Sequence, residues 1–467
     1  MQKTVRQILA VLGRVIFIGL SVQIVLGILW LCLNFANLQE FGESIFYVQI
    51  SKNFICDEYT GILYPVFLLL ARGVEKLIRL PYYCVIYTVQ ILIAIYSGHA
   101  FLQRLKKTGK GMDIWSSLAL LTIPMALQCH LAVLPYSLAG SFFLQEISFA
   151  LDAVRRKEGI HAKQLVKITP FWLLCALLLP EYLYLGAVPV LLVFLCELVR
   201  CIPGLRKAMQ YTVTHLMLQV IVIAAFGGMI VGMNSLTQVK GYYGKVHNSV
   251  EAAFASRFGW SSLMDTYDSR PEELRAAVDR GKLMESAYYA ENMARVFGPL
   301  IEEAVGEERA KELFMELAKD AWESNRRDIL HEMAWDAAGY TLSPIVLQMQ
   351  LTGRGYDAYS GRNYEIMRHN APVLSGIYMD YSCWWFAAGL CITAVMQVLY
   401  AVCSRKIITW KNILSVMLVL LSCGGLVVWY TMQGAGIMDY KNTIAVNCLW
   451  IVWSLLVMQM SVCRREE

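Results

Sequence analysis

Long apolar blocks with little or no charge dominate this sequence. The first runs from Val15 to Phe35, and the others lie near 82–103, 114–134, 136–151, 168–200, 209–233, 381–403, 412–430 and 443–462. A soluble core would spread its apolar residues with a period of 2 or 3.6, and soluble domains carry about 25% charged residues where this chain carries 16%. A helix of about 20 apolar residues spans the hydrocarbon core of a bilayer. We therefore expect an all-α fold: a polytopic transmembrane helical bundle of about 10–11 segments with a helical extracytoplasmic insert.

The N-terminus and the cysteines fit this class. Lys3, Arg6 and Arg14 precede the first apolar block, which is too long for a signal peptide and has no small-x-small cleavage site after it. We interpret it as an uncleaved signal anchor. Of the 13 cysteines, only Cys56 lies in a polar loop, and no CxxC spacing occurs. The cysteines are therefore expected to be small apolar helix residues.

Loop charge predicts the topology. Basic loops favour the cytoplasmic side of a membrane, and they occur at 104–110, 155–167, 200–207, 405–411 and 464–465. This places both termini in the cytoplasm and the segment 235–375 outside. That segment holds 16 basic and 21 acidic residues, which leaves 25 basic and 15 acidic residues elsewhere. The excess of positive charge is thus explained by cytoplasmic loops, and no nucleic-acid partner is expected.

One segment conflicts with simple counting of crossings. An odd number of crossings must separate the outer loop 36–58 from the basic loop 104–110, yet two apolar runs lie between them, at 59–72 and 82–103. The first run is short and is followed by charged residues. We expect 59–72 to be a half-membrane or interfacial helix, which reduces the number of crossings to about ten.

The chain is predicted to have three parts: an N-terminal transmembrane module at 1–234 with an acidic first outer loop at 36–58, an extracytoplasmic helical domain at 235–375, and C-terminal transmembrane helices at 376–467. In the second part, Ser269-Arg270-Pro271-Glu272-Glu273 is a typical helix start. His331-Glu332 begins like HExxH but lacks the second histidine, so no two-histidine zinc site is available. No GxxxxGK[ST], GxGxxG or GxSxG motif occurs, which excludes the usual nucleotide-driven transporters and hydrolases.

The first outer loop gathers carboxylates at the membrane surface. Residues 43–54 are amphipathic at helical spacing, with Phe46, Ile50 and Phe54 on one face, as in a helix that lies along a membrane. Carboxylates beside it can accept a proton from an attacking hydroxyl or hold a divalent cation against phosphate oxygens.

These residues and two later motifs resemble a known family, the membrane glycosyltransferases of the GT-C fold. That family uses polyprenyl-phosphate sugars and places an acidic residue in the first outer loop, a Tyr about four positions on, and a Tyr-Pro at the next segment. Glu43, Tyr47 and Tyr64-Pro65 match in order and spacing. Leu134–Ala139 resembles its Tyr-Ser-Leu helix opening, and Leu179–Leu183 resembles its Arg-Pro-Glu-x-Leu motif. The family's usual acid is Asp rather than Glu, and the Arg of the last motif is Leu179 here.

The resemblance implies that Glu43 is the general base on the acceptor hydroxyl, with Asp57 and Glu58 as alternatives or as metal and acceptor ligands. The residues expected to bind substrate are Tyr47, Lys52, His130, Tyr136, Glu181, Arg257 and Arg354. Several have simpler interpretations: Lys52, His130 and Arg257 as solvated interface charges, Glu181 as a helix-break residue, and Arg354 as part of an ordinary surface loop at 352–364.

The predicted function is sugar transfer from a lipid-linked donor to an acceptor at the extracytoplasmic face of the cell membrane. The expected partners are the polyprenyl-phosphate sugar and membrane lipids. The cofactor is unassigned, with a divalent cation as the candidate. Two alternatives stay open: a transporter, flippase or polymerase of lipid-linked glycans, and a catalytically inactive protein of GT-C type. The sugar, the acceptor and the oligomeric state are not fixed by the sequence.

Overall fold

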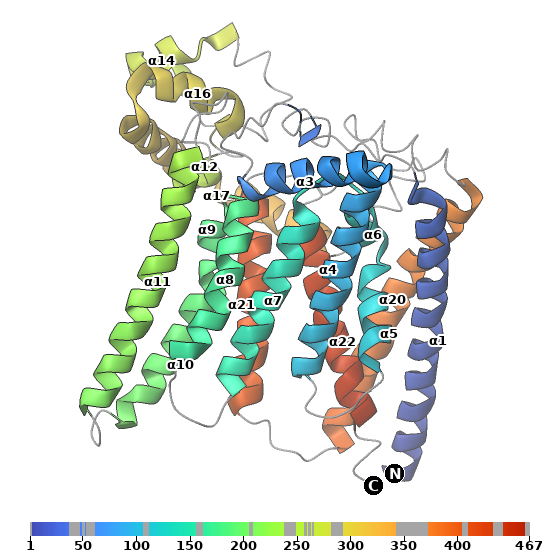
Figure 1. Cartoon of the computed structure of the whole chain (residues 1–467). Helices are drawn as coiled ribbons and strands as arrows, with labels where there is room; N and C mark the ends of the chain where they lie inside the picture. The colour runs from blue at the N-terminus through green and yellow to red at the C-terminus, as the bar shows by residue number, and fades with distance from the viewer. Residues whose placement is uncertain are drawn as a thin grey trace.

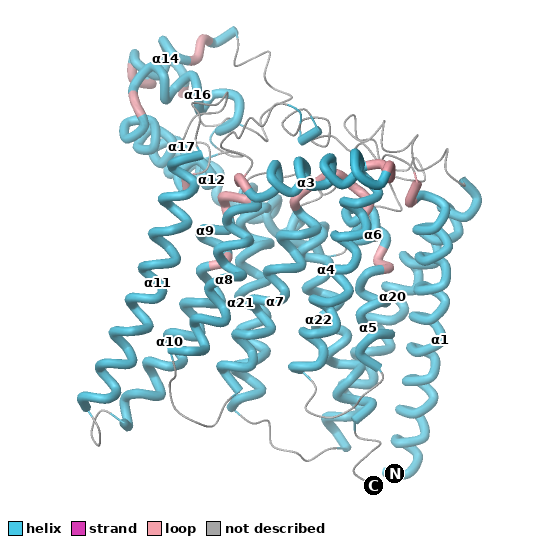
Figure 2. The backbone as a smooth tube through the Cα atoms, in the orientation of Figure 1, coloured by secondary structure: helices cyan, strands magenta, loops and turns pink. Residues whose placement is uncertain are grey.

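The structure is a computed structural model that describes residues 2–36, 47–48, 52, 61–105, 112–155, 162–204, 209–237, 249–255, 259, 263, 266–281, 293–341, 372–403, 410–432 and 442–462. The described residues form helices joined by turns, and no strand occurs among them (Figure 2). The bundle helices are α1 (Gln2–Asn34), α4 (Tyr82–Leu105), α5 (Met112–Leu121), α6 (Pro124–His130), α7 (Tyr136–Arg155), α8 (Ala162–Leu178), α9 (Tyr182–Leu185), α10 (Ala187–Gly204), α11 (Met209–Thr237), α20 (Pro372–Cys403), α21 (Trp410–Met432) and α22 (Asn442–Val462).

Several of these helices could cross a membrane by length and composition. Among the described residues, 5 helices carry such a span: Thr4–Asn34, Tyr82–Arg104, Leu216–Met233, Val373–Leu399 and Leu414–Met432. Shorter apolar stretches lie at Leu165–Leu178, Tyr182–Cys196 and Thr443–Val457. This agrees with the expectation of an all-helical polytopic protein.

The two ends of the bundle differ. Both chain termini lie at one end, here called the terminal end (Figure 1). The opposite end carries α3 (Leu63–Ile78) and a separate group of helices, α12 (Val250–Ala255), η2 (Tyr267–Ser269), α14 (Glu272–Ala277), α16 (Met293–Val305) and α17 (Glu307–Thr341). We call this end the insert end and this group the insert.

Helix α3 lies across the insert end instead of running through the bundle (Figure 1). Its buried residues Tyr64, Leu68 and Ala71 recur at helical spacing on the face toward the bundle, whereas Leu70 and Leu77 are exposed. The helix ends at Arg79, whose φ of 58° is left-handed and whose N–H donates to the Glu75 carbonyl at 2.9 Å. The helix expected near 59–72 is thus observed at Leu63–Ile78 and lies across the end of the bundle (Figure 1).

The apolar block predicted at 114–134 consists of two helices with a break at Ile123. Pro124 has no N–H to donate to a preceding carbonyl, so it opens the helix. Gln23 on α1 donates from Nε2 to the carbonyls of Ala119 and Thr122, at 3.4 and 3.3 Å, and the Tyr378 hydroxyl of α20 also donates to the Thr122 carbonyl. Since broken helices in an apolar medium need such substitute partners, α1 and α20 are fixed against the break.

The insert has its own apolar core. Phe297 and Ile301 of α16 pack against Leu313, Phe314 and Leu317 of α17, with further core residues Ala252, Ala255, Leu263, Leu274, Val278 and Ala310. Gly306, with a φ of 83°, makes the sharp turn between the two helices, a conformation that favours glycine. Helix α17 is broken at Asn325, whose φ and ψ of −127° and 28° are not helical.

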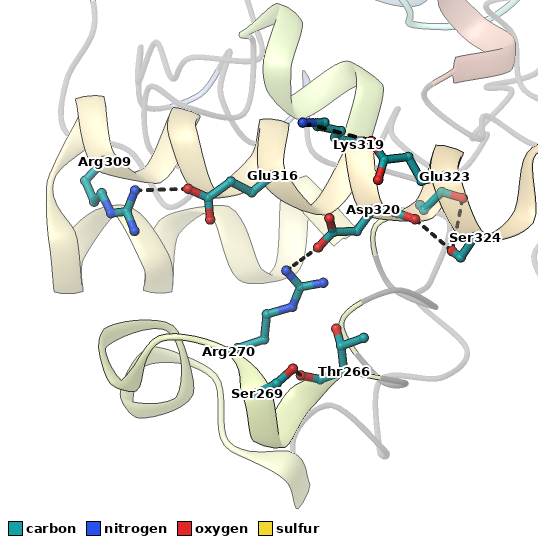
Figure 3. Close-up of polar contacts among 10 residues, drawn as sticks. Thr266, Ser269, Arg270, Arg309, Glu316, Lys319, Asp320, Glu323 and Ser324 are labelled. Atoms are coloured by element: carbon teal, nitrogen blue, oxygen red, sulfur yellow. Dashed lines mark hydrogen bonds and ion pairs between the residues drawn. The ribbon is translucent and has the colours of Figure 1, made fainter.

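Ion pairs tie the surface of the insert together. Arg270, before α14, bonds Asp320 on α17 at 2.6 Å (Figure 3). Arg309 bonds Glu273 at 2.8 Å and Glu312 at 2.9 Å, which raises the pKa of the Arg309 guanidinium further above its ordinary value. These contacts fix α14 against α17.

The insert also contacts the bundle. Helices α12 and α17 pack against α21, and α17 packs against α22. Tyr184 of α9 interacts electrostatically with Glu251 of α12 and Lys311 of α17, and its ring lies 5.8 Å from that of Trp429 on α21. The insert is therefore joined to the bundle through α9, α21 and α22.

Candidate functional site

The sequence-predicted residues that the structure describes gather at the insert end. Tyr47 is buried, and its ring meets that of Tyr64 edge-on at 5.3 Å between centroids. The Tyr64 hydroxyl donates to Oε1 of Gln90 on α4 at 3.4 Å. The first outer loop is thus connected to α3, and through α3 to the interior of the bundle.

Gln90 continues this chain of contacts. Its Nε2 donates to the backbone carbonyls of His130 at 2.9 Å and Ala132 at 3.0 Å. These carbonyls lie where the α6 helix ends, and the last carbonyls of a helix have no partner within it. Gln90 is fully buried, so its amide provides the hydrogen bonds that water cannot provide at this position. The side chain thereby fixes the α6–α7 turn against α4.

His130 and α7 complete the chain. His130 Nδ1 and Ser137 Oγ share a hydrogen bond of 2.6 Å, and both side chains are buried. Tyr136 is the first residue of α7, directly before Ser137, and is also buried. His130 is therefore held within the protein, and its alternative interpretation as a solvated interface charge is wrong.

Glu181 occupies the break between α8 and α9. The helix stops at Leu178 and Pro180 follows it, after which Glu181 lies at only 8% exposure. The Trp172 indole N–H donates to the carbonyls of Tyr182 and Leu183, both at 3.1 Å. The interpretation of Glu181 as a helix-break residue thus matches its position between α8 and α9. The residue is also nearly fully buried there.

Glycine lets the chain that follows the loop 36–58 lie against this break. A Cβ on Gly61 would collide with the Leu177 carbonyl oxygen, so the backbone approaches α8 more closely than any other residue permits. The loop is fixed where it begins as well, because the Tyr83 hydroxyl donates to the Ala36 carbonyl at 3.1 Å. Both ends of the acidic loop are therefore attached to the insert end of the bundle.

The remaining sequence-predicted site residues cannot be placed in the same way. Lys52 is exposed. Those that lie outside the described residues are Glu43, Asp57, Glu58, Arg257 and Arg354. Within the part of the chain that the structure describes, no group of three or more His, Cys, Asp or Glu side chains could hold a metal ion.

Two buried polar residues were missed in the sequence. Gln90 is uncharged and lies in the block 82–103, where nothing but its polarity distinguishes it. Glu146 lies in the block 136–151 and is fully buried on α7. A carboxylate inside an apolar segment marks a functional position by default. The argument that selected Glu181 therefore applies equally to Glu146.

Comparison with protein-family models, with curated proteins and with solved structures gives no match for this chain.

Proposed function

We propose that this protein is a membrane glycosyltransferase that transfers a sugar from a polyprenyl-phosphate donor to an acceptor at the extracytoplasmic face. In this proposal about ten segments cross the membrane, the termini are cytoplasmic, and the insert lies outside. Its support is the position of both termini opposite the insert (Figure 1). Arg104 and Arg155, which lie in the last turns of α4 and α7, are further support, because basic helix ends favour the cytoplasmic side.

The observation that carries the function is the convergence of motifs that are far apart in the sequence. Tyr47, Tyr64 and Ser137 belong to segments that resemble the GT-C pattern, and Gln90 connects them through His130 into one chain of contacts. Gly61 brings the end of the first loop against Leu177, four residues before Glu181. This contact between segments that are distant in the sequence is the support for the proposal.

The chemistry assigned to Glu43 is general-base catalysis. Its carboxylate accepts the proton of the acceptor hydroxyl, and the hydroxyl oxygen attacks the anomeric carbon of the donor sugar. The bond from that carbon to the phosphate oxygen breaks, and the polyprenyl phosphate leaves with the electron pair. Glu43 precedes Tyr47 by four residues, so the buried Tyr47 would anchor the base to the site.

Donors of hydrogen bonds must stabilise the leaving phosphate. In the proposal this role belongs to the predicted substrate-binding residues, with His130 and Tyr136 inside the protein and Lys52 at the surface. A divalent cation held against the phosphate oxygens is the candidate cofactor for this step. Asp57 and Glu58, which precede Gly61 by four and three residues, would bind the acceptor or a cation.

The test uses the full-length protein in lipid membranes with a labelled polyprenyl-phosphate sugar and a mixture of candidate acceptors. We expect wild-type protein to consume the donor and Glu43→Gln to abolish consumption while still folding and inserting. Glu308→Gln changes an exposed carboxylate of the insert and should keep full activity. Undiminished transfer by Glu43→Gln would remove Glu43 as the base. Movement of the intact donor across proteoliposome membranes without transfer would favour a flippase instead.

A further inference from the structure

Glu146 lies inside the bundle on α7, the helix that packs against α4, α6, α8, α10, α21 and α22. Its side chain is 0% exposed. Neither carboxyl oxygen has a hydrogen-bond partner among the described residues. This combination is unusual, because buried polar groups in proteins almost always find a partner.

The surroundings of Glu146 are largely apolar. The Phe171 ring of α8 stacks on that of Phe149, with 5.4 Å between centroids, and lies tilted against that of Phe142 at 6.4 Å. Glu146 falls midway between these two phenylalanines in α7, so it lies at the level of Phe171. One turn further along α8, the Cys175 thiol interacts electrostatically with the carboxyl and donates to the Ala139 carbonyl at 3.5 Å.

The nearest cation in α4 is committed elsewhere. Arg104 donates from Nη1 to Gln145 Oε1 at 3.2 Å and to Ser148 Oγ at 2.6 Å, and its Nε pairs with Asp152 at 3.2 Å. The guanidinium carbon also lies 3.6 Å from the Phe149 ring centroid. The Arg104 guanidinium is thus held by other side chains of α7, toward the terminal end of that helix.

Other titratable groups lie on the helices that pack around α7. Among the described residues they include Tyr87 and His99 on α4, His130 on α6, Lys167 and Cys175 on α8, Cys196 on α10, Cys423 and Tyr430 on α21, and Cys448 on α22. His130 is bonded to Ser137 at the insert end, and Cys423 interacts with Cys448. None of these groups is hydrogen-bonded to the Glu146 carboxyl.

An ionised carboxylate in such a place would be very costly. Removing a charge from water without a partner costs several kcal/mol even after the protein relaxes, whereas a neutral acid loses far less. We propose that Glu146 binds a proton and is a neutral carboxylic acid at the centre of the bundle. Loss of this proton places an uncompensated charge between α7 and α8 and loosens their packing.

Infrared spectroscopy of the full-length protein in lipid nanodiscs tests this directly. At neutral pH we expect the carbonyl band of a protonated carboxylic acid in the wild type and its loss in Glu146→Gln. The control Glu308→Gln changes an exposed carboxyl side chain of the insert and should leave the band unchanged. Absence of a band that depends on Glu146 would overturn the proposal.

Thermal unfolding gives a second readout. We expect the melting temperature of the wild type to fall as the pH is raised into the alkaline range. Glu146→Gln and Glu146→Met, which both mimic a neutral side chain, should fold and lose this dependence on pH. If both variants failed to fold at neutral pH while the wild type folded, an ionised Glu146 with a counter-charge would be indicated and the proposal would be wrong.

Discussion

The side-chain amide of Gln90 donates a 2.9 Å hydrogen bond to the backbone carbonyl of His130, although 40 residues separate the two in the sequence. The bond joins α4 to the end of α6 inside the bundle. It also holds the turn from which Ser137 reaches back to His130. The geometry of the candidate site therefore depends on one uncharged side chain.

Replacing Gln90 with Leu should destabilise the protein by about 1–3 kcal/mol, since the carbonyls of His130 and Ala132 lose their donor. Thermal unfolding in detergent would measure the change. Gln103→Leu, at an exposed position of the same helix, should change stability by less than about 0.5 kcal/mol. Equal stability of the two variants would show that the Gln90 bonds contribute nothing.

Gly61→Ala should be destabilising because the new Cβ collides with the Leu177 carbonyl oxygen. Overpacking of this kind costs about 1–3 kcal/mol. The matched control is Gly73→Ala on α3, where a Cβ meets nothing within 4 Å. It should stabilise α3 by about 0.5–1 kcal/mol, because alanine is favoured over glycine within a helix. Melting temperatures that shift in the same direction for both variants would contradict the close approach at Gly61.

Gln23 and Tyr378 should act together on the break between α5 and α6, since both donate to the Thr122 carbonyl. In a double-mutant cycle with Gln23→Leu and Tyr378→Phe, we expect an interaction energy of about 0.5–3 kcal/mol. Each single variant leaves one donor in place, whereas the double variant leaves the carbonyl without either. Strictly additive changes in unfolding free energy would show that the two donors act independently.

The Arg270–Asp320 pair should stabilise the insert more than the Lys319–Glu323 pair beside it (Figure 3). The Arg270 side chain is only 9% exposed and bonds at 2.6 Å, whereas Lys319 is 74% exposed and lies 3.9 Å from its partner. We expect Arg270→Ala to cost about 1.5–3 kcal/mol, the range for hydrogen bonds to charged groups, and Lys319→Ala to cost less than about 0.5 kcal/mol. Limited proteolysis would report the difference as faster cleavage within the insert.

Much of the fold was predictable from the length of the apolar blocks, since helix formation in an apolar medium follows from the need to pair every backbone group. The count of crossings led us to expect that the segment near 59–72 does not run through the bundle, and α3 lies across its end (Figure 1). The break at Pro124 was not predicted. The carbonyl that the break leaves without a helical partner accepts hydrogen bonds from Gln23 and Tyr378, and these tertiary contacts cannot be seen in the sequence.

The candidate site was predictable where residues carry a recognisable chemical pattern. Tyr47, His130 and Glu181 could be selected by motif or charge. Gln90 could not, since an isolated amide in an apolar block has no pattern and acquires its role only when α4 packs beside the α6–α7 turn. Glu146 does carry a recognisable pattern, because it is a single carboxylate among apolar residues.

Helix α17 contacts two parts of the protein at once. It contributes Leu313, Phe314 and Leu317 to the insert core, and it also packs against α21 and α22. A segment shared in this way cannot unfold in one part without removing contacts from the other. The insert and the C-terminal helices should therefore denature in a single cooperative transition, and separating them by cleavage would leave two unstable fragments.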